Sequence, residues 1–540
     1  MTIATSFGAG QRGLERFPPD VNRTAVGWVK RSATQHLTAC TKVVGSRPAE
    51  EAGLDPTYVE NALAALELAR REEVMRAELR SWALLAATSL AIAGIFAFLL
   101  AMSRLPGTER IIHWPLEFFS KGLVIHVVFS LVVWFLAIFA LLASLATLEM
   151  ADGKAVAGGT GRLGLAFVAM SFPLLFLPAF HEDTVATLNN YVPVIIHPGY
   201  YAGLVLLLAG ILLPVVRLFR AAARAIKAGH PLSPLAVAMT AGGVVYCVAL
   251  VSLAFGVALV WGEAPSRTMH EHLFWGGGHV LQFLYALLML TGWFTLANTC
   301  LGRGAIDPDI FRLAVKLIAV FSLAAVGFYL VLEPFSLLQT EAFRRLQFVL
   351  AFPSLLVALA GLAAVVQRRK AGPLPWHDPA FVALVLSPVV FGAGGIMGLL
   401  ISGSDTRTPA HYHGVIAGVN LACMGLMLSV CLPRLERPVR ARVRLRLQIA
   451  LFGLGQLMAS AGLFLAGGYG APRKTPAGAA DLVNGAVAGM YLHGVGALLA
   501  VIGGILFVAT ILKALLDHSQ SQEGLVEGRV GEFPAEAYPA

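Results

Sequence analysis

Residues 82–103 read WALLAATSLAIAGIFAFLLAMS, an apolar stretch without a single charged side chain. A helix needs about 20 consecutive apolar residues to cross the hydrocarbon core of a bilayer, so this stretch is long enough to span a membrane. The whole chain of 540 residues has the same character, with 57% hydrophobic residues, 13% charged residues and a mean hydropathy of +0.74. Soluble proteins carry about 25% charged residues, so this composition excludes a soluble enzyme.

Further apolar stretches of similar length follow, and together they predict an all-α, polytopic membrane bundle of about twelve helices. A polar cytoplasmic arm is expected over residues 1–81, a membrane domain over 82–515 and a polar cytoplasmic tail over 516–540. Within the arm, Thr57 to Ser81 shows the periodicity of an amphipathic helix. We place the spans near residues 82–103, 122–148, 162–180, 193–216, 235–261, 272–300, 312–332, 346–366, 380–402, 410–432, 446–468 and 487–514.

Basic residues are concentrated in alternate short loops, at residues 217–227, 368–370 and 434–446. Cytoplasmic loops of membrane proteins carry an excess of Lys and Arg, so both termini are expected on the cytoplasmic side. The membrane is expected to be a bacterial-type cytoplasmic membrane. The formal charge of +9 therefore reflects topology and gives no support to a nucleic-acid partner. The five cysteines form no CxxC pair, so disulfide frameworks, thiolate zinc sites and covalently attached haem are not expected.

Four histidines fall at one depth within three of the predicted spans. His126 lies in the second span, His279 in the sixth, and His411 and His413 in the tenth. At a rise of 1.5 Å per residue, they lie within about 5–12 Å of the outer boundary. A single buried histidine is usually explained by a helix-to-helix hydrogen bond. A group of four ionisable residues inside a membrane instead indicates a functional site.

The spacing of His411 and His413 indicates what such a site holds. Positions i and i+2 face opposite sides of a helix, so one ion cannot easily bind both side chains. Two separate ligands on the two sides of the helix fit better. Haem iron accepts axial imidazole, and two haems that flank one helix would engage both residues.

Three motifs and His126 carry a family resemblance over residues 82–515. They are FWGGGHVLQF around His279, SDTRTPAHYHGVIAGV around His411 and His413, and GGYGAPRKTP around Arg473 and Lys474. In this order and on these helices, they resemble the catalytic subunit of the haem-copper oxidase superfamily, which includes cytochrome c oxidases and nitric oxide reductases.

The resemblance implies a role for each of these residues. His126 and His413 would be the axial ligands of a low-spin haem, and His411 the proximal ligand of a high-spin haem that binds a diatomic gas. Arg473 and Lys474 would neutralise haem propionates, which need cations at a membrane boundary.

The second metal departs from the family pattern. His279 would be its ligand from helix six, but the family's two adjacent histidines on helix seven are replaced by Glu333-Pro334 in FYLVLEPFSLLQ. A non-haem metal held by His279 and Glu333 is therefore expected, with iron favoured over copper and with Glu271, His272 or Gln282 as further ligands. The alternative for Glu333 is a helix-end carboxylate in water.

A second departure bears on the substrate. Oxygen reductases of the best-known class carry a tyrosine four residues after the helix-six histidine, where this chain has Phe283. Tyr285 is rotated well away on a regular helix. A respiratory terminal reductase with nitric oxide as substrate is favoured, and oxygen is the close alternative.

A non-catalytic haem-binding membrane protein also stays open, as does a plain solute transporter. The electron donor would be quinol, a cytochrome c or a cupredoxin, and a small accessory subunit is a further candidate partner.

Overall fold

The computed structural model describes residues 56–517, apart from 114, 116, 152–157, 402 and 475–480. Within these ranges it contains twelve helical spans that are long and apolar enough to cross a membrane, which confirms the predicted all-α bundle. Residues 1–55 of the predicted arm and residues 518–540 of the predicted tail lie outside the described part. The chain divides into two compact units after Val74.

The elements follow one another with short connections. The first half comprises α2 (Pro56–Arg104), η2 (Thr108–Arg110), α3 (Phe118–Val127), η3 (Val128–Val133), α4 (Trp134–Met150), α5 (Gly158–Phe176), η4 (Leu177–Phe180), β1 (Val185–Thr187), β2 (Val194–Ile196), α6 (Pro198–Lys227), α7 (Pro234–Leu259) and α8 (Arg267–Cys300). The second half comprises α9 (Pro308–Ser322), α10 (Ala324–Val331), α11 (Leu337–Leu346), η5 (Gln347–Leu350), α12 (Ala351–Ala371), α13 (Pro379–Leu399), α14 (Arg407–Leu426), η6 (Met427–Cys431), α15 (Leu432–Arg434), α16 (Arg442–Gly468) and α17 (Asn484–Leu516).

Helix α2 runs without a break through residues 81 and 82, where the sequence predicts the end of the arm. The segment 57–81 contains neither glycine nor proline, so nothing in it interrupts helical hydrogen bonding. The predicted amphipathic helix and the first membrane span are therefore one continuous helix.

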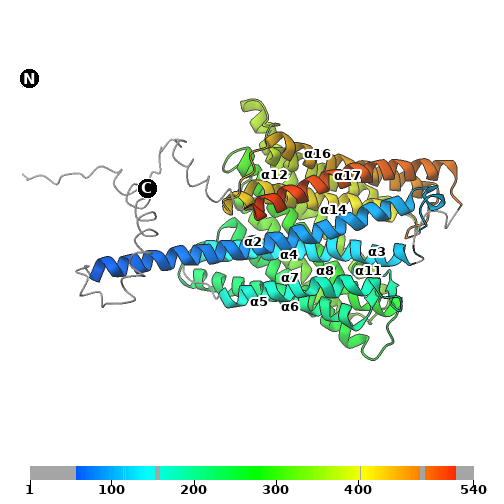
Figure 1. The fold of residues 1–540 in the computed structure, drawn as a ribbon, viewed down its shortest axis with the longest axis horizontal. Coiled ribbons are helices and arrows are strands. Elements are labelled where there is room, and N and C mark those ends of the chain that lie inside the picture. Colours follow the sequence, from blue (N-terminus) through cyan, green and yellow to red (C-terminus); the bar gives the residue numbers. More distant parts are fainter. Residues whose placement is uncertain are drawn as a thin grey trace, which may run out of the picture. The chain divides into compact units, whose positions relative to one another are not determined.

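Three spans are the most enclosed of the bundle, and they carry His126, His279, His411 and His413. The helices α4, α8 and α14, which belong to these spans, are labelled in Figure 1. Their apolar windows are 72–78% buried inside the protein, whereas no other span exceeds 50%. These central spans run over residues 118–150, 267–300 and 407–434. Helix α14 packs against α8, α13 and α16, and α16 packs along α17. The histidines are thus enclosed by protein, and the outer helices are left to face lipid.

Two of the central spans contain a turn of π-helix. It forms η3, which begins two residues after His126, and η6, which follows α14. Single π turns inside α-helices are rare, and those that occur are often found near functional sites.

A short β-hairpin on the connection between η4 and α6 lies beside the central spans. Its strands β1 and β2 pair antiparallel, with Val185 opposite Ile196 and Thr187 opposite Val194. The end of β1 next to the hairpin loop is held against α8, since the Thr187 hydroxyl lies 2.9 Å from Nδ1 of His270.

Helices α13 and α14 approach so closely that their contact requires glycine. A Cβ atom added to Gly394 would lie 2.4 Å from the backbone nitrogen of Val415, and one added to Gly414 would lie 2.6 Å from Cα of Gly394. Small residues of this kind allow membrane helices to pack backbone to backbone.

We therefore expect Gly394→Ala to lower the free energy of unfolding by about 1–3 kcal/mol, because the new methyl group forces the two helices apart. Gly395→Ala is the matched control, since a Cβ atom there meets nothing within 4 Å. Thermal unfolding of both variants in detergent measures the difference. Equal midpoints for the two variants would show that the α13–α14 contact is not limiting.

A buried ion pair joins three of the helices. Arg217 of α6 donates to Glu78 of α2 at 2.8 Å and to the hydroxyl of Ser144 on α4 at 3.0 Å. The two charged side chains are only 5% and 10% exposed. A charge left alone at such a site is costly, whereas an apolar replacement of both partners is not.

Arg217→Met should therefore destabilise the protein by about 3–5 kcal/mol, because it strands the Glu78 carboxylate. The double variant with Glu78→Leu should recover most of that loss. Arg312→Met, which breaks an exposed pair with Asp309, serves as the control and should cost less than about 1 kcal/mol. A double variant as unstable as the single one would contradict the interpretation.

Candidate functional site

His411 is held by the neighbouring helix α13. Its Nδ1 lies 2.8 Å from the carbonyl oxygen of Gly394. A carbonyl only accepts, so Nδ1 carries the ring proton and Nε2 keeps its lone pair. Nε2 makes no hydrogen bond within the described part of the chain, which leaves it available to a ligand.

His413 faces the other side of α14. Its ring lies 6.5 Å from that of His493 on α17, and His126, Arg104 and Gln456 of α16 also lie close to it. His411 by contrast contacts α13. The structure therefore confirms that the two side chains point to opposite sides of the helix.

His126 repeats the arrangement of His411. Its Nδ1 lies 3.0 Å from the carbonyl oxygen of Ala93 on α2, so that Nδ1 donates and Nε2 keeps its lone pair. Among the described residues, no hydrogen bond to Nε2 is present. Histidines that bind metals typically have one nitrogen fixed by a carbonyl in this way, which orients the other nitrogen. His126 and His411 thus have the donor chemistry of axial ligands to a haem iron.

Arg104, the last residue of α2, is a feature that the sequence reasoning did not identify. It lies close to His413 and His493, and its Nε has no hydrogen-bond partner in the described structure. A buried guanidinium N–H without an acceptor favours a polar or anionic group nearby. The sequence signal was an arginine placed directly after an uncharged span.

Arg473 and Lys474 contact the tip of the hairpin. Arg473 donates to the side-chain oxygen of Asn190 at 2.8 Å, and Lys474 donates to the carbonyl of Leu188 at 2.5 Å. Burial, with Arg473 and Arg267 nearby, lowers the pKa of Lys474 to about 8. Cations that repel one another in a partly buried site would be stabilised by carboxylates, so this basic pair fits haem propionates.

His279 differs from the other three histidines because both of its nitrogens are engaged by the protein. Nδ1 lies 2.6 Å from the carbonyl of Trp275, and Nε2 lies 2.8 Å from the hydroxyl of Tyr191. The ring is fully buried and also contacts Phe343. Its available lone pair is therefore occupied by a hydroxyl proton.

The predicted second-metal site is not assembled in this arrangement. Glu333 is exposed at the end of α10, and its carboxylate makes no hydrogen bond or ion pair in the described part of the chain. Glu271 bonds to Asn190 instead, and His272 stacks on Phe335. Among the described residues, no group of three or more His, Cys, Asp or Glu side chains could hold a metal ion. The residues present therefore do not fit this metal.

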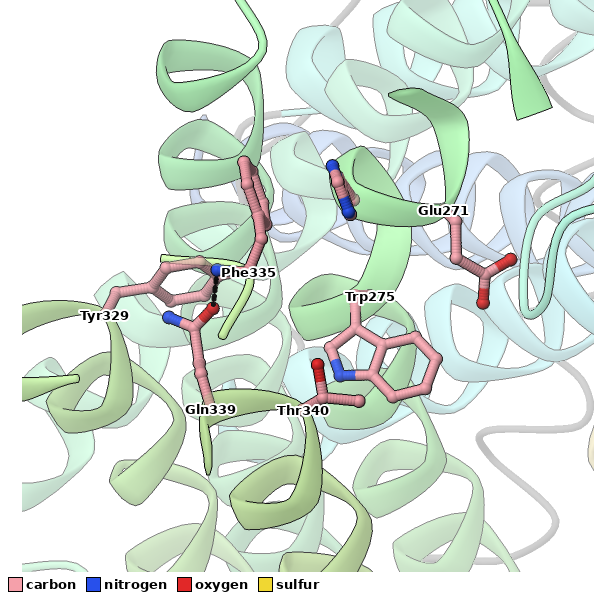
Figure 2. A pocket seen from close by; sticks show the side chains of 7 residues that line it. Glu271, Trp275, Tyr329, Phe335, Gln339 and Thr340 are labelled. Atoms are coloured by element: carbon pink, nitrogen blue, oxygen red, sulfur yellow. Dashed lines mark hydrogen bonds between the residues drawn. The ribbon is translucent and has the colours of Figure 1, made fainter. Parts of the chain in front are cut away.

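A cavity of about 130 Å³ lies one helical turn from His279. In the view of Figure 2, the side chain of Trp275 lies between those of Thr340 and Glu271. The dashed line marks the hydrogen bond from the backbone nitrogen of Phe335 to the side-chain oxygen of Gln339. The indole nitrogen of Trp275 has no partner within the described structure. The cavity has room for several water molecules beside polar groups.

Helix α8 offers no tyrosine to His279, as the sequence predicts. Phe283 is fully buried, and Tyr285 packs against Phe135 of α4 with ring centroids 4.7 Å apart. The tyrosine that does reach His279, Tyr191, comes from the hairpin and was not identified from the sequence.

Comparison with known proteins shows which family the chain belongs to. Residues 79–506 match the family described as cytochrome c and quinol oxidase polypeptide I. An uncharacterized protein of Rickettsia prowazekii is 23% identical over 79% of this chain and 94% of its own. An uncharacterized protein of Aquifex aeolicus is 29% identical over 64% of this chain and 82% of its own.

Two further similarities come from oxidases. The cytochrome c oxidase subunit 1 of Thermus thermophilus is 28% identical over 52% of this chain and 54% of its own. A heme-copper terminal oxidase, solved as a dimer by cryo-electron microscopy, superposes with a TM-score of 0.70 at 18% identity, covering 82% of this chain and 84% of the other.

Members of this family are membrane-embedded respiratory oxidoreductases that generally bind two haems and a copper or iron ion. The match spans most of the chain, from α2 to α17, and includes His126, His279, His411 and His413. The chain therefore belongs to the haem-copper oxidase subunit I family and is an oxidoreductase.

Proposed function

We propose that this chain is the catalytic subunit of a respiratory terminal reductase, in which electrons pass from a low-spin to a high-spin haem that binds a diatomic gas. His126 and His413 would hold the low-spin haem, and His411 would hold the high-spin haem. The observation that carries the proposal is the division of His411 and His413 between the two sides of α14.

The protein groups around these histidines support the same assignment. The carbonyls of Ala93 and Gly394 fix the rings of His126 and His411. Each Nε2 therefore has its direction set before a haem binds, and the ring need not be ordered on binding. Arg104 would bind a polar haem substituent, and Arg473 and Lys474 would bind propionates. When bound, the haems supply one-electron chemistry and a site for the gas.

Nitric oxide is the favoured substrate, with oxygen as the alternative. Reduction of nitric oxide needs two electrons, and α8 lacks the tyrosine that would supply an additional electron and proton for oxygen. The Thermus relative named cytochrome c oxidase supports the oxygen alternative. The proposal includes no second metal, because Glu333 is exposed and His279 is already paired.

The setting of the enzyme is also part of the proposal. The chain would lie in a bacterial-type cytoplasmic membrane with both termini in the cytoplasm, as the basic loops indicate. Electrons would come from quinol, a cytochrome c or a cupredoxin, because the sequence has no motif for covalently attached haem. A small accessory subunit would be a further partner.

A non-catalytic haem protein is a second candidate, favoured by the unassembled metal site. Such a protein would keep the histidines of α3 and α14 and would bind haem without turnover. Purified protein distinguishes the two, since only the enzyme shows gas-dependent reoxidation of its reduced haems.

The ligand assignment predicts distinct spectra for three histidine variants. His413→Ala and His126→Ala should each remove the low-spin haem signal, because each takes away an axial nitrogen. His411→Ala should remove the high-spin signal and carbon monoxide binding while leaving the low-spin signal. His230→Ala, at an exposed position between α6 and α7, is the control and should retain both haems. Optical and electron paramagnetic resonance spectra measure the outcome, and an unchanged low-spin signal in His413→Ala would refute the assignment.

The substrate assignment predicts faster turnover of nitric oxide than of oxygen in one preparation. The reduced protein should consume nitric oxide and release nitrous oxide, measured with gas electrodes and mass spectrometry. Faster oxygen consumption would select the oxygen alternative. Stable haems without turnover of either gas would select the non-catalytic candidate.

A further inference from the structure

Tyr191 is presented by a strained turn at the tip of the β1–β2 hairpin. Its φ angle is +64°, and the backbone nitrogen of Val192 donates to the carbonyl of Asn190 across it at 2.8 Å. A three-residue turn with positive φ at its centre is rare for a residue with a side chain. Such conformations persist where surrounding contacts hold them, and they gather at functional sites.

Those surrounding contacts come from helix α8 and from the basic pair. Glu271 of α8 accepts from the backbone and side-chain nitrogens of Asn190 at 2.8 and 2.6 Å. Arg473 donates to the other side of the same asparagine, and Lys474 to the carbonyl of Leu188. The hairpin tip is therefore fixed to both the helix that carries His279 and the basic pair.

Helix α8 is shaped to receive the tyrosine. A Cβ atom added to Gly278 would lie 2.4 Å from Cβ of Tyr191, so only glycine leaves room at that position. The Tyr191 ring then lies 4.5 Å from the His279 ring and 5.8 Å from Trp275.

The Tyr191 hydroxyl lies in a continuous hydrogen-bonded cluster. It donates to Nε2 of His279 at 2.8 Å and accepts from the side-chain amide of Gln347 at 3.2 Å. His279 in turn donates from Nδ1 to the Trp275 carbonyl. Burial raises the pKa of the Tyr191 phenol above its usual range, so the hydroxyl keeps its proton at neutral pH.

We propose that the cluster of Tyr191, His279 and Gln347 takes the place of the second metal, and that the Tyr191 hydroxyl is a hydrogen-bond donor to the gas during reduction. This inference rests on the proposed two-haem function. His279 acts as a positioning residue, because it holds the hydroxyl until substrate arrives. The hydroxyl can then turn about its C–O bond toward a substrate oxygen, while Gln347 remains bonded to it.

The donor set explains why a metal is not expected here. A metal on His279 would need the lone pair of Nε2 that now accepts the Tyr191 proton. It would also need further ligands, and the described residues supply no group of three. A phenol and an amide that share their hydrogen bonds with an imidazole are instead a satisfied polar network.

The first test is the metal content of the purified full-length protein. We expect iron equal to the haem content and neither copper nor non-haem iron in stoichiometric amount, with no gain in turnover after incubation with Cu²⁺ or Fe²⁺. A third, tightly bound metal per two haems would overturn the metal-free cluster and leave the proposed function standing. A protein without haem would instead refute the proposed function.

The second test compares Tyr191→Phe with Tyr201→Phe. Tyr201 is a matched control, because its hydroxyl lies 2.9 Å from Nε2 of His270 on the same helix α8 and outside the proposed site. In Tyr191→Phe we expect kcat to fall by about a hundredfold with little change in KM, as for the loss of a donor used in the transition state. The control should keep the activity of the unmodified protein.

A spectroscopic signature separates this role from a structural one. The C–O stretching frequency of carbon monoxide bound to the reduced protein should shift in Tyr191→Phe and stay unchanged in Tyr201→Phe, while both variants retain two haems. Gln347→Leu should shift it in the same direction by a smaller amount, because it removes the second bond to the hydroxyl. Unchanged kcat and C–O frequency in Tyr191→Phe would overturn the proposed role.

Discussion

A histidine buried among apolar helices has two ring nitrogens to satisfy, and the centre of this bundle depends on how each one is satisfied. The carbonyls of Ala93 and Gly394 take the N–H groups of His126 and His411, so each ring is held by a neighbouring helix and keeps one lone pair. His279 is different, because Tyr191 already donates to its second nitrogen. The same residue type therefore keeps one nitrogen lone pair unpaired in the described structure on two helices and accepts a hydrogen bond on a third.

The bundle and the directions of the α14 histidines could be predicted from the sequence because simple periodic rules determine them. Backbone groups in a bilayer must bond within their own segment, so long apolar stretches have to be helices. The helical period then places residues i and i+2 on opposite sides, as His411 and His413 show. Neither rule required knowledge of which helices are neighbours, whereas the contact between α13 and α14 became visible only in the structure.

Tyr191 and Glu333 show where such rules fail. The position of Tyr191 depends on contacts of the neighbouring Asn190 with Glu271 and Arg473. These residues are far away in the sequence, and no local pattern in the hairpin encodes the contacts. Glu333 precedes Pro334, which cannot continue a helix, and α10 already ends at Val331. Beyond a helix end the period no longer determines the direction of a side chain, so the position that Glu333 shares with the family's helix-seven histidines does not bring it to His279.

The π turns of η3 and η6 have a consequence for how this chain can vary in length. A π turn contains one residue more than the α-helix it interrupts, and each residue turns a helix by about 100°. Deleting one residue of η3 would therefore restore a regular helix and swing His126 away from Ala93 relative to the inner half of its span. The π turn thus sets the direction of the side chains in α3, which carries His126, relative to those in α4. In related chains, the insertion or deletion of one residue in this turn would change the direction of the histidine side chain without any substitution of the histidine itself.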